Sequence, residues 1–412
     1  RLKSDLVPLL LACAEGDLDG CEAPEWDTRP AITVILASQG YPGKYEKGIP
    51  IHGLDALETG DDLQVFHAGT ALQGDQLVTN GGRVLAVTAL IYWPADQGGT
   101  GDLALTLVQP NLKQEDIDDA SKFEDQFQTI AGLSRPLQPG TRRLVLWPES
   151  GVPDYLRDGY PQRYYIQMTA GGDPAFARAR IGDSIGPGSL LLTGLVDLEI
   201  GTVDGRRKAI GAYNAVTSID PDGKLGERYA KAHLVPYGEY LPLRALLEPL
   251  GLSRMVAGTI DFIPGPGPRT QDLGQYGMAG MQICYEIVFS GEVVDRGNRP
   301  DYIFNPSNDG WFGTWGPPQH LAQARMRAAE EGLPVLRSTT TGISAVIDAR
   351  GVVREHIGRN VAGRIDTLVP PPHAPTWFAR MGHWLTLIWG IVFLALSLVA
   401  MRFAGGYPTR NT

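Results

Sequence analysis

Three short segments of the sequence contain side chains that could carry out acyl transfer. Glu149 ends one apolar run and Cys284 ends another, so each lies at or just after a predicted buried strand. Lys231 begins a third segment, Lys-Ala-His-Leu-Val-Pro-Tyr-Gly-Glu. In α/β folds, reactive side chains gather at the carboxyl ends of strands. Together these residues offer a base, a cation and a thiol, which could form and resolve a thioester.

The types of these residues suggest a division of roles. A cysteine thiol has an ordinary pKa of about 8.5, so it needs a base before it can attack an ester. Glu149 could accept the thiol proton, and Lys231 could stabilise the tetrahedral oxyanion together with the backbone N–H of Tyr285. Taken singly, a strand-end cysteine is usually a core residue, and a lysine usually lies on the surface. The combination of all three favours a catalytic triad of Glu149, Lys231 and Cys284.

Other polar and aromatic residues of the same segments are candidates for a supporting role. Glu239 and Glu286 could orient Lys231 or a substrate amine, although a role in structural hydrogen bonds would explain these two acids equally well. Asn308 and Trp311 could line the pocket, whereas we interpret His233 and His320 as structural. The predicted substrate-binding or supporting set is Glu239, Tyr285, Glu286, Asn308 and Trp311.

Composition excludes several classes of protein. The chain has 412 residues, a formal net charge of −10 and three cysteines. An acidic chain is a poor ligand for nucleic acid, so no nucleic-acid partner is expected. Three cysteines cannot build a disulfide scaffold at this length, and we interpret Cys13 and Cys21 as structural or surface residues. No Cys-x-x-Cys or His-x-x-x-His spacing occurs, so we predict neither a metal site nor a cofactor.

The pattern of residues 1–91 predicts a small α+β domain. Asn80-Gly81-Gly82 is a strong hairpin signal, and it should join the last two strands of the domain. The expected elements are a helix over 3–15 and strands over 31–38, 63–66, 76–79 and 83–90. Residues 92–101 are rich in Pro, Gly and polar side chains, as a linker would be.

Residues 102–372 show a different pattern. Short apolar strands alternate with helical stretches throughout this region, which favours an α/β sandwich or a barrel-like sheet. A run of three prolines at 370–372 ends the pattern.

The segment 384–402 predicts one transmembrane helix. Residues 384–401 carry no charge, and 18 residues of helix rise about 27 Å, close to the hydrocarbon thickness of a bilayer. A buried core helix is the alternative, but it rarely stays apolar on every face for this length. The few flanking arginines slightly favour a cytoplasmic C-terminus. No signal peptide is visible in the first thirteen residues.

Ordered motifs over about 102–402 resemble the nitrilase, or carbon–nitrogen hydrolase, superfamily, and within it most closely the apolipoprotein N-acyltransferases. The motifs are Trp-Pro-Glu-Ser at 147–150, Ile-Cys-Tyr-Glu at 283–286, Asn-Pro-Ser-Asn-Asp-Gly-Trp-Phe-Gly at 305–313, and the longer segments 229–242 and 319–325. The resemblance implies a nitrilase-like αββα sandwich with Glu149, Lys231 and Cys284 as its triad. It also implies that an acyl chain passes from a phospholipid through a cysteine thioester to the N-terminal amine of a diacylglyceryl-lipoprotein.

The same resemblance implies a place in the cell. The family acts at the bacterial inner membrane, with its catalytic domain on the periplasmic side and several membrane helices before that domain, which we do not find in this sequence. The family pattern also often has a Trp four residues after the position of Gln114, where this chain has Asp118. Local substrate contacts are therefore expected to differ.

Residues 1–91 resemble an unrelated family, the C-terminal domain of phosphoribosylamine–glycine ligase, an ATP-grasp enzyme of purine synthesis. The matching segments are 1–6, 40–43, 45–48, 65–70 and 78–89. His67 and Arg83 could contribute to a nucleotide-side surface in a complete ligase, but here we interpret them as solvated or packing residues. Since the ATP- and metal-binding part of that family has no counterpart in the sequence, we expect no ligase activity.

Two other functions remain open at this point. One is a membrane-anchored amidase, which would share the triad but use water rather than an amine as acyl acceptor. The other is an inactive chimera of two truncated enzymes.

Overall fold

The computed structural model describes most of the chain, in two compact units that comprise residues 1–97 and 98–412. The described residues are 2–15, 22, 24–27, 31–54, 56–57, 59–60, 62–90, 99–117, 119–242 and 261–404. The boundary between the units falls within the predicted linker 92–101. Cys21, Asp118 and most of the linker lie outside the described residues.

The first unit contains a helix and two small antiparallel sheets. One sheet has the strand order β1-β5-β2, and the other is the hairpin of β3 and β4. The elements are α1 (Leu6–Glu15), β1 (Ala31–Ala37), β2 (Leu63–His67), β3 (Thr70–Gln73), β4 (Gln76–Thr79) and β5 (Arg83–Leu90). Cys13 is exposed on α1, and both His67 and Arg83 are exposed.

The predicted hairpin around Asn80-Gly81-Gly82 is wrong. β4 pairs with β3 across a two-residue turn, whereas β5 pairs with β1 and β2. Close packing of the glycine backbone explains the difference: a Cβ on Gly81 would lie 2.9 Å from the Cα of Gly69. The glycines therefore let the chain cross from one sheet to the other, rather than turn back on the same sheet.

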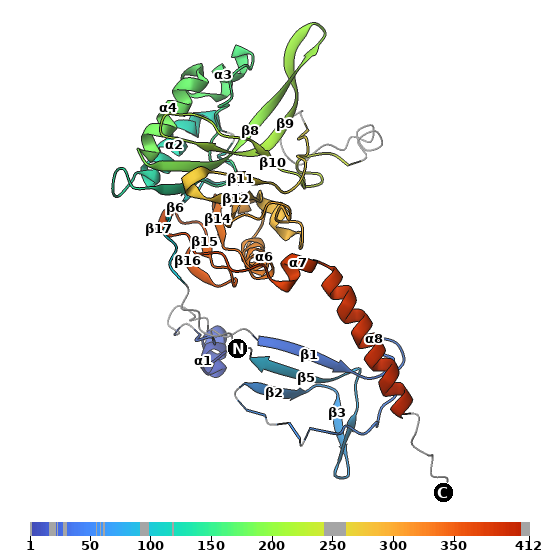
Figure 1. Ribbon diagram of the computed structural model, residues 1–412. Coiled ribbons are helices and arrows are strands. Elements are labelled where there is room, and N and C mark those ends of the chain that lie inside the picture. The colour runs from blue at the N-terminus through green and yellow to red at the C-terminus, as the bar shows by residue number, and fades with distance from the viewer. Residues whose placement is uncertain are drawn as a thin grey trace. The chain divides into compact units, whose positions relative to one another are not determined.

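The second unit is built on two six-stranded sheets (Figure 1). The first has the order β10-β9-β8-β7-β6-β17, and the second has the order β11-β12-β13-β14-β15-β16. The strands of the first sheet are β6 (Ala104–Gln109), β7 (Arg143–Leu146), β8 (Ser189–Val203), β9 (Arg206–Ile219), β10 (Tyr229–Ala230) and β17 (Gly363–Leu368). Those of the second are β11 (Thr270–Asp272), β12 (Met278–Met281), β13 (Tyr302–Ser307), β14 (Val335–Thr339), β15 (Ser344–Ile347) and β16 (Val353–Ile357).

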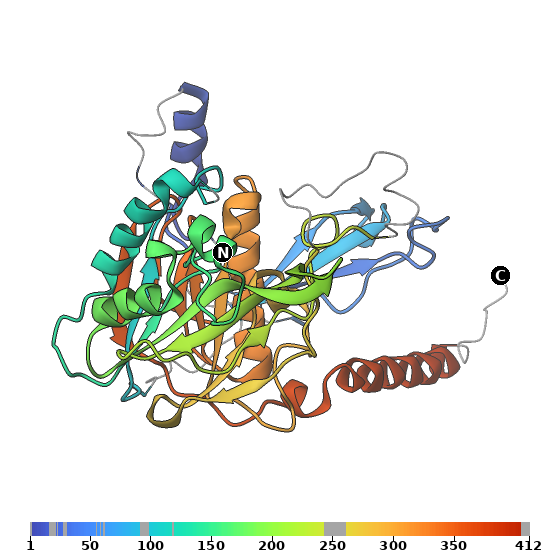
Figure 2. The same ribbon diagram turned by 90° about the horizontal axis from the view of Figure 1, so that it is seen from above.

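Helices cover the outer faces of the two sheets. The described α-helices of this unit are α2 (Phe123–Ser134), α3 (Gln162–Met168), α4 (Pro174–Ile185), α6 (Gly316–Glu331), α7 (Trp377–Met381) and α8 (Trp384–Ala404), of which α2, α4 and α6 pack on the sheets. α2 and α4 pack on the first sheet, while α6 packs on β14 and β15 of the second (Figure 2). One apolar cluster joins the inner faces of both sheets, and two further clusters lie beneath the helices. The predicted αββα sandwich is therefore confirmed.

Parallel pairing in the centre of each sheet aligns strand ends. β6, β7 and β8 are parallel neighbours in the first sheet, and β12, β13 and β14 are parallel neighbours in the second. The carboxyl ends of parallel strands meet at one edge of a sheet, which is where this class of fold places its functional side chains. Glu149 follows β7, Cys284 follows β12 and Asn308 follows β13.

The segment predicted to cross a membrane forms α8, whose side chains are described as far as Leu398. Of the helices that the described residues form, none is long and apolar enough to span a bilayer. The prediction of a transmembrane helix at 384–402 is therefore not confirmed.

Candidate active site

Cys284 is the first residue of the short helix η5 (Cys284–Val288), which begins shortly after strand β12. Its φ is +50°, in the left-handed region that a residue with a Cβ rarely adopts. The residue is 5% exposed. Burial raises the pKa of the Cys284 thiol well above its ordinary value, and the carboxylate of Glu149 raises it further, whereas Lys231 opposes the shift. The resting sulfur is therefore a neutral thiol that needs a base to become a nucleophile.

Lys231 is a buried cation between two carboxylates. The residue is 1% exposed, and its Nζ lies 3.0 Å from Glu239 Oε1 and 3.7 Å from Glu149 Oε1. Burial alone would lower the pKa of Lys231, but the charges of Glu149 and Glu239 outweigh it and raise the pKa. Lys231 therefore stays charged in a buried site, where a positive charge acts strongly on a nearby oxyanion.

Glu149 is held by hydrogen bonds to both of its oxygens. Asn214 donates its Nδ2–H to Oε1 at 2.7 Å, and the backbone N–H of Asn308 donates to Oε2 at 2.8 Å. The backbone of Glu149 also lies against Gly194 of β8, where a Cβ would come within 2.7 Å of the Glu149 Cα. The carboxylate is thus fixed in orientation by groups from both sheets.

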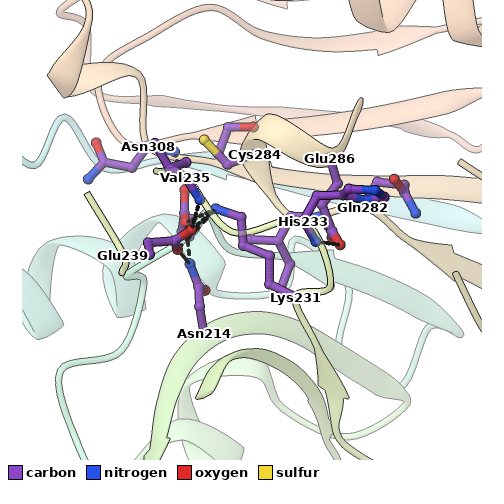
Figure 3. A network of polar contacts seen from close by, with 12 residues as sticks. Asn214, Lys231, His233, Val235, Glu239, Gln282, Cys284, Glu286 and Asn308 are labelled. Atoms are coloured by element: carbon purple, nitrogen blue, oxygen red, sulfur yellow. Dashed lines mark hydrogen bonds and ion pairs between the residues drawn. The ribbon is translucent and has the colours of Figure 1, made fainter. Parts of the chain in front are cut away.

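Asn214 bonds to both Glu149 and Glu239, and Glu239 bonds to Lys231, so the four form one network. Figure 3 shows Asn214, Glu239 and Lys231 side by side. Asn214 Nδ2 donates to Glu239 Oε1 at 2.7 Å as well as to Glu149, and the backbone N–H of Val235 donates to Glu239 Oε2 at 2.7 Å. The prediction that Glu239 supports Lys231 agrees with this geometry. Figure 3 shows the sulfur of Cys284 on the side of the network where the Lys231 side chain ends.

The carboxylate of Glu286 bonds to two backbone segments, so it is not free to bind a substrate. It accepts hydrogen bonds from the backbone N–H of Ala232 at 2.7 Å and of Ile283 at 2.8 Å, and from the Tyr229 hydroxyl at 2.9 Å. Burial raises the pKa of Glu286 despite these donors. Because Ala232 follows Lys231 and Ile283 precedes Cys284, this carboxyl group ties the cation to the nucleophile.

Asn308 also has a clear place in the site. Its Nδ2 donates to Gln114 Oε1 at 2.7 Å, and its Oδ1 accepts from the hydroxyl of Thr340 at 2.9 Å. These contacts fix the backbone N–H that binds Glu149. Asn308 is thus a support for the predicted base.

The structure does not bring the side chains of Tyr285 and Trp311 into this network. The Tyr285 ring packs edge-on against Phe289, with ring centroids 5.0 Å apart, and Phe289 stacks on His233 at 4.2 Å. Trp311 is 51% exposed. The hydrogen bonds of the described residues contain none between either side chain and the triad.

Sequence reasoning missed Asn214 and Gln114. Asn214 lies within the long strand β9, and its position opposite Glu149 depends on strand register, which no local motif reveals. Gln114 gave a weak signal, because it lies shortly after the predicted strand that begins the sandwich. No cluster of three or more His, Cys, Asp or Glu side chains able to hold a metal occurs in the part of the chain that the structure describes.

Residues 105–366 match the carbon–nitrogen hydrolase family model, which is well over half of the chain. The chain belongs to the carbon–nitrogen hydrolase family. Residues 31–92 match a second model, the C domain of phosphoribosylglycinamide synthetase. Both resemblances drawn from the sequence are therefore confirmed.

Several curated proteins that are similar to this chain are named apolipoprotein N-acyltransferase. Apolipoprotein N-acyltransferase from Rhodopseudomonas palustris is 37% identical over 73% of this chain and 54% of its own length. The proteins of the same name from Bradyrhizobium diazoefficiens and Brucella melitensis are 39% and 31% identical, over 72% and 85% of this chain and 53% and 64% of their own lengths. The chain thus spans about half to two thirds of the length of the relatives it matches.

Proposed function

We propose that this chain is an N-acyltransferase that moves an acyl chain from a phospholipid, through a thioester on Cys284, to the N-terminal amine of a diacylglyceryl-lipoprotein. The observation that carries the proposal is the buried arrangement of Cys284, Lys231 and Glu149 at the strand ends of two packed sheets. The relatives named apolipoprotein N-acyltransferase support N-acyl transfer to a lipoprotein, and we place the reaction at the bacterial inner membrane as part of the proposal.

The first half-reaction forms the thioester. Glu149 accepts the thiol proton as the Cys284 sulfur attacks the ester carbonyl of the donor. Lys231 stabilises the oxyanion of the tetrahedral intermediate, an interaction typically worth about 10²–10³ in rate. The intermediate then collapses, the C–O bond of the ester breaks, and Glu149 returns the proton to the leaving lysophospholipid alcohol.

The second half-reaction transfers the acyl group. The free amine of the acceptor attacks the thioester carbonyl, and Glu149 takes a proton from the attacking nitrogen. Lys231 again stabilises the oxyanion, the C–S bond breaks, and the proton on Glu149 passes to the sulfur. The products are an amide and the original Cys284 thiol, so no cofactor is needed for the balance of the reaction.

Hydrolysis is the alternative outcome of the same thioester, because water could replace the amine. An amidase of this kind would use the same three residues. The identity of the acyl acceptor therefore distinguishes the two functions.

The test follows the fate of the acyl group. The protein is incubated in detergent with a phospholipid whose acyl chain is labelled, with or without a diacylglyceryl-cysteine lipopeptide. We expect labelled N-acyl lipopeptide and lysophospholipid, and neither product from a Cys284→Ser variant. Labelled free fatty acid as the main product in the presence of lipopeptide would favour hydrolysis and contradict the proposal.

A further inference from the structure

A histidine outside the proposed triad contacts the main chain of the nucleophile. Nε2 of His320, on α6, lies 3.0 Å from the carbonyl oxygen of Cys284. A carbonyl oxygen can only accept a hydrogen bond, so Nε2 must carry a proton to make this contact favourable. His320 is 6% exposed, which means that water does not compete for the carbonyl.

The carbonyl that His320 contacts belongs to a strained residue. Cys284 has a φ of +50°, and a non-glycine residue stays in that region only where its surroundings hold it there. Backbone contacts hold the amide side of the turn, because Ile283 donates to Glu286. On the carbonyl side, Cys284 begins the 3₁₀-helix η5, whose i→i+3 pattern directs the Ile287 N–H to this oxygen, and His320 adds a second donor from α6. Loss of the His320 donor would weaken the hold on the peptide after Cys284 and let the sulfur shift.

The other ring nitrogen of His320 is fixed by a buried ion pair. Nδ1 lies 2.9 Å from Asp309 Oδ1 and 3.1 Å from Arg337 Nη2. Arg337 is fully buried and donates to both oxygens of Asp309 at 2.8 Å. Burial would raise the pKa of Asp309, but Arg337 and His320 lower it to about 2, so this carboxyl group is charged at neutral pH.

Burial and the Arg337 charge lower the pKa of His320, whereas Asp309 and the Cys284 carbonyl oppose the shift. In the neutral ring with its proton on Nε2, Nδ1 accepts a hydrogen bond from Arg337 and makes none with Asp309. The groups that face the ring are the Asp309 carboxylate, the Arg337 guanidinium, the Cys284 carbonyl and the edge-on ring of Phe312. Gly342 leaves the space for the carboxylate, since a Cβ there would come within 2.1 Å of Asp309 Oδ2.

Asp309 follows directly after Asn308, whose backbone N–H binds Glu149 Oε2 at 2.8 Å. A continuous path therefore runs from the predicted base, through Asn308 and Asp309, to His320 and the Cys284 carbonyl. This path joins the nucleophile to the base by a route independent of Lys231 and Glu286.

We propose that His320 is a positioning residue that holds the main chain of Cys284 in its left-handed conformation, and so fixes the sulfur against Glu149. The inference rests on the proposed function, because it assigns a role in forming the thioester on Cys284. His320 does not touch the reacting atoms, and Arg337 and Asp309 act only by holding the imidazole ring.

Two substitutions of His320 distinguish the contact made by Nε2 from the contacts made by Nδ1. The amide nitrogen of His320→Gln can occupy the place of Nε2 and still donate to the Cys284 carbonyl. The amide of His320→Asn reaches only the place of Nδ1, so it keeps a contact with Asp309 and loses the carbonyl. His356→Asn, at an exposed position on β16, is the matched control.

The readout is the rate of Cys284 acylation by phospholipid, measured by mass over a range of lipid concentrations, with the Tm of each variant. A displacement of about 1 Å in a reacting group can cost on the order of 10²-fold, so His320→Asn should lower the maximal rate by about 10- to 100-fold with little change in KM. His320→Gln should stay within a few-fold of the unaltered protein. Equal losses in both variants that follow their Tm, or no loss in His320→Asn, would overturn the proposal.

A second measurement keeps this inference separate from the proposed function. Alkylation of Cys284 by iodoacetamide, followed at its own peptide by mass, reports the state of the thiol without a lipid substrate. His320→Asn should shift the pH midpoint of this alkylation, and His320→Gln should not. If the unaltered protein is never acylated while this pattern holds, the proposed function fails and the positioning role stands. A midpoint that is the same in all variants would overturn the role.

Discussion

At the scale of single residues, the site depends on one buried ammonium group that serves two carboxylates. Lys231 Nζ is closer to Glu239, at 3.0 Å, than to Glu149, at 3.7 Å. Glu239 therefore holds the cation in place, which leaves Glu149 available to exchange a proton with the thiol. Replacing the cation should affect both stability and rate.

Lys231→Met keeps much of the volume of the side chain but removes its charge. Breaking a buried ion pair at one partner typically costs about 3–5 kcal/mol, because the remaining charges are left uncompensated. We expect a loss of this size in the free energy of unfolding and a fall of at least about 10²-fold in the acylation rate, because an oxyanion donor is lost. Urea unfolding and acylation kinetics check both, with Lys224→Met at an exposed position as the control. A variant that keeps the normal rate would show that Lys231 does not stabilise the oxyanion.

Site residues that lie in short sequence motifs could be predicted from the sequence. Site residues whose contacts depend on strand register or helix packing could not. Glu149, Lys231, Cys284, Glu239, Glu286 and Asn308 were each predicted from a short local segment, and the structure brings them together. Asn214 and His320 were not assigned to the site, because strand register and helix packing decide what they contact. Trp311 was predicted to line the pocket from its motif alone, yet it is half exposed.

At the scale of elements, the turn at Cys284 depends on the segment around Lys231. Glu286, on η5, accepts hydrogen bonds from Ile283, after β12, and from Tyr229 of β10 and Ala232, on either side of Lys231. The two segments belong to different sheets, so one carboxyl group sets their relative position at the site.

Glu286→Gln should loosen this junction. The amide group adds a donor where backbone N–H groups already point, so at least one buried donor loses its partner. An unsatisfied buried group costs about 1–3 kcal/mol, and we expect a loss of this size in unfolding free energy together with slower acylation. Glu292→Gln is the control, because Glu292 lies nearby with its side chain 57% exposed. An unchanged Tm in Glu286→Gln would contradict the structural role of the carboxyl group.

Alternation of strands and helices was enough to predict the sandwich, but it did not give the strand pairing. Every residue of β7, β13 and β14 is buried because both faces of these strands are covered, and their order in the sheets follows from packing. In the first unit, the Asn-Gly-Gly signal failed because close backbone packing, rather than a hairpin, uses those glycines.

At the scale of the whole molecule, the candidate site exists only when the two sheets pack together. Glu149 and Lys231 follow strands of the first sheet, while Cys284 and Asn308 follow strands of the second. The central apolar cluster that joins the sheets therefore supports the geometry of the site as well as the stability of the unit.

Buried carboxyl groups should make stability depend on pH. Burial raises the pKa of Asp154, Glu286 and Glu331 in the folded state. The folded protein then binds more protons than the unfolded chain at pH values above the ordinary carboxyl pKa of about 4. We expect these three groups to raise the free energy of unfolding as the pH falls from 7 towards about 5.

Tm measured across this range tests the sign, and Glu331→Gln should flatten the slope because it removes one of the titrating groups. The lowered pKa of His320 acts in the opposite sense within this range, whereas that of Asp309, near 2, does so only at much lower pH. A pH slope that Glu331→Gln leaves unchanged would contradict the assignment of Glu331 to this group.

The most direct test of the central claim is the intact mass of the protein after incubation with phospholipid in detergent. We predict that the mass increases by one acyl chain, that the adduct is absent in Cys284→Ser, and that it disappears when a lipopeptide amine is added. A folded protein that gains no acyl mass, or an adduct that persists in Cys284→Ser, would contradict acyl transfer through Cys284.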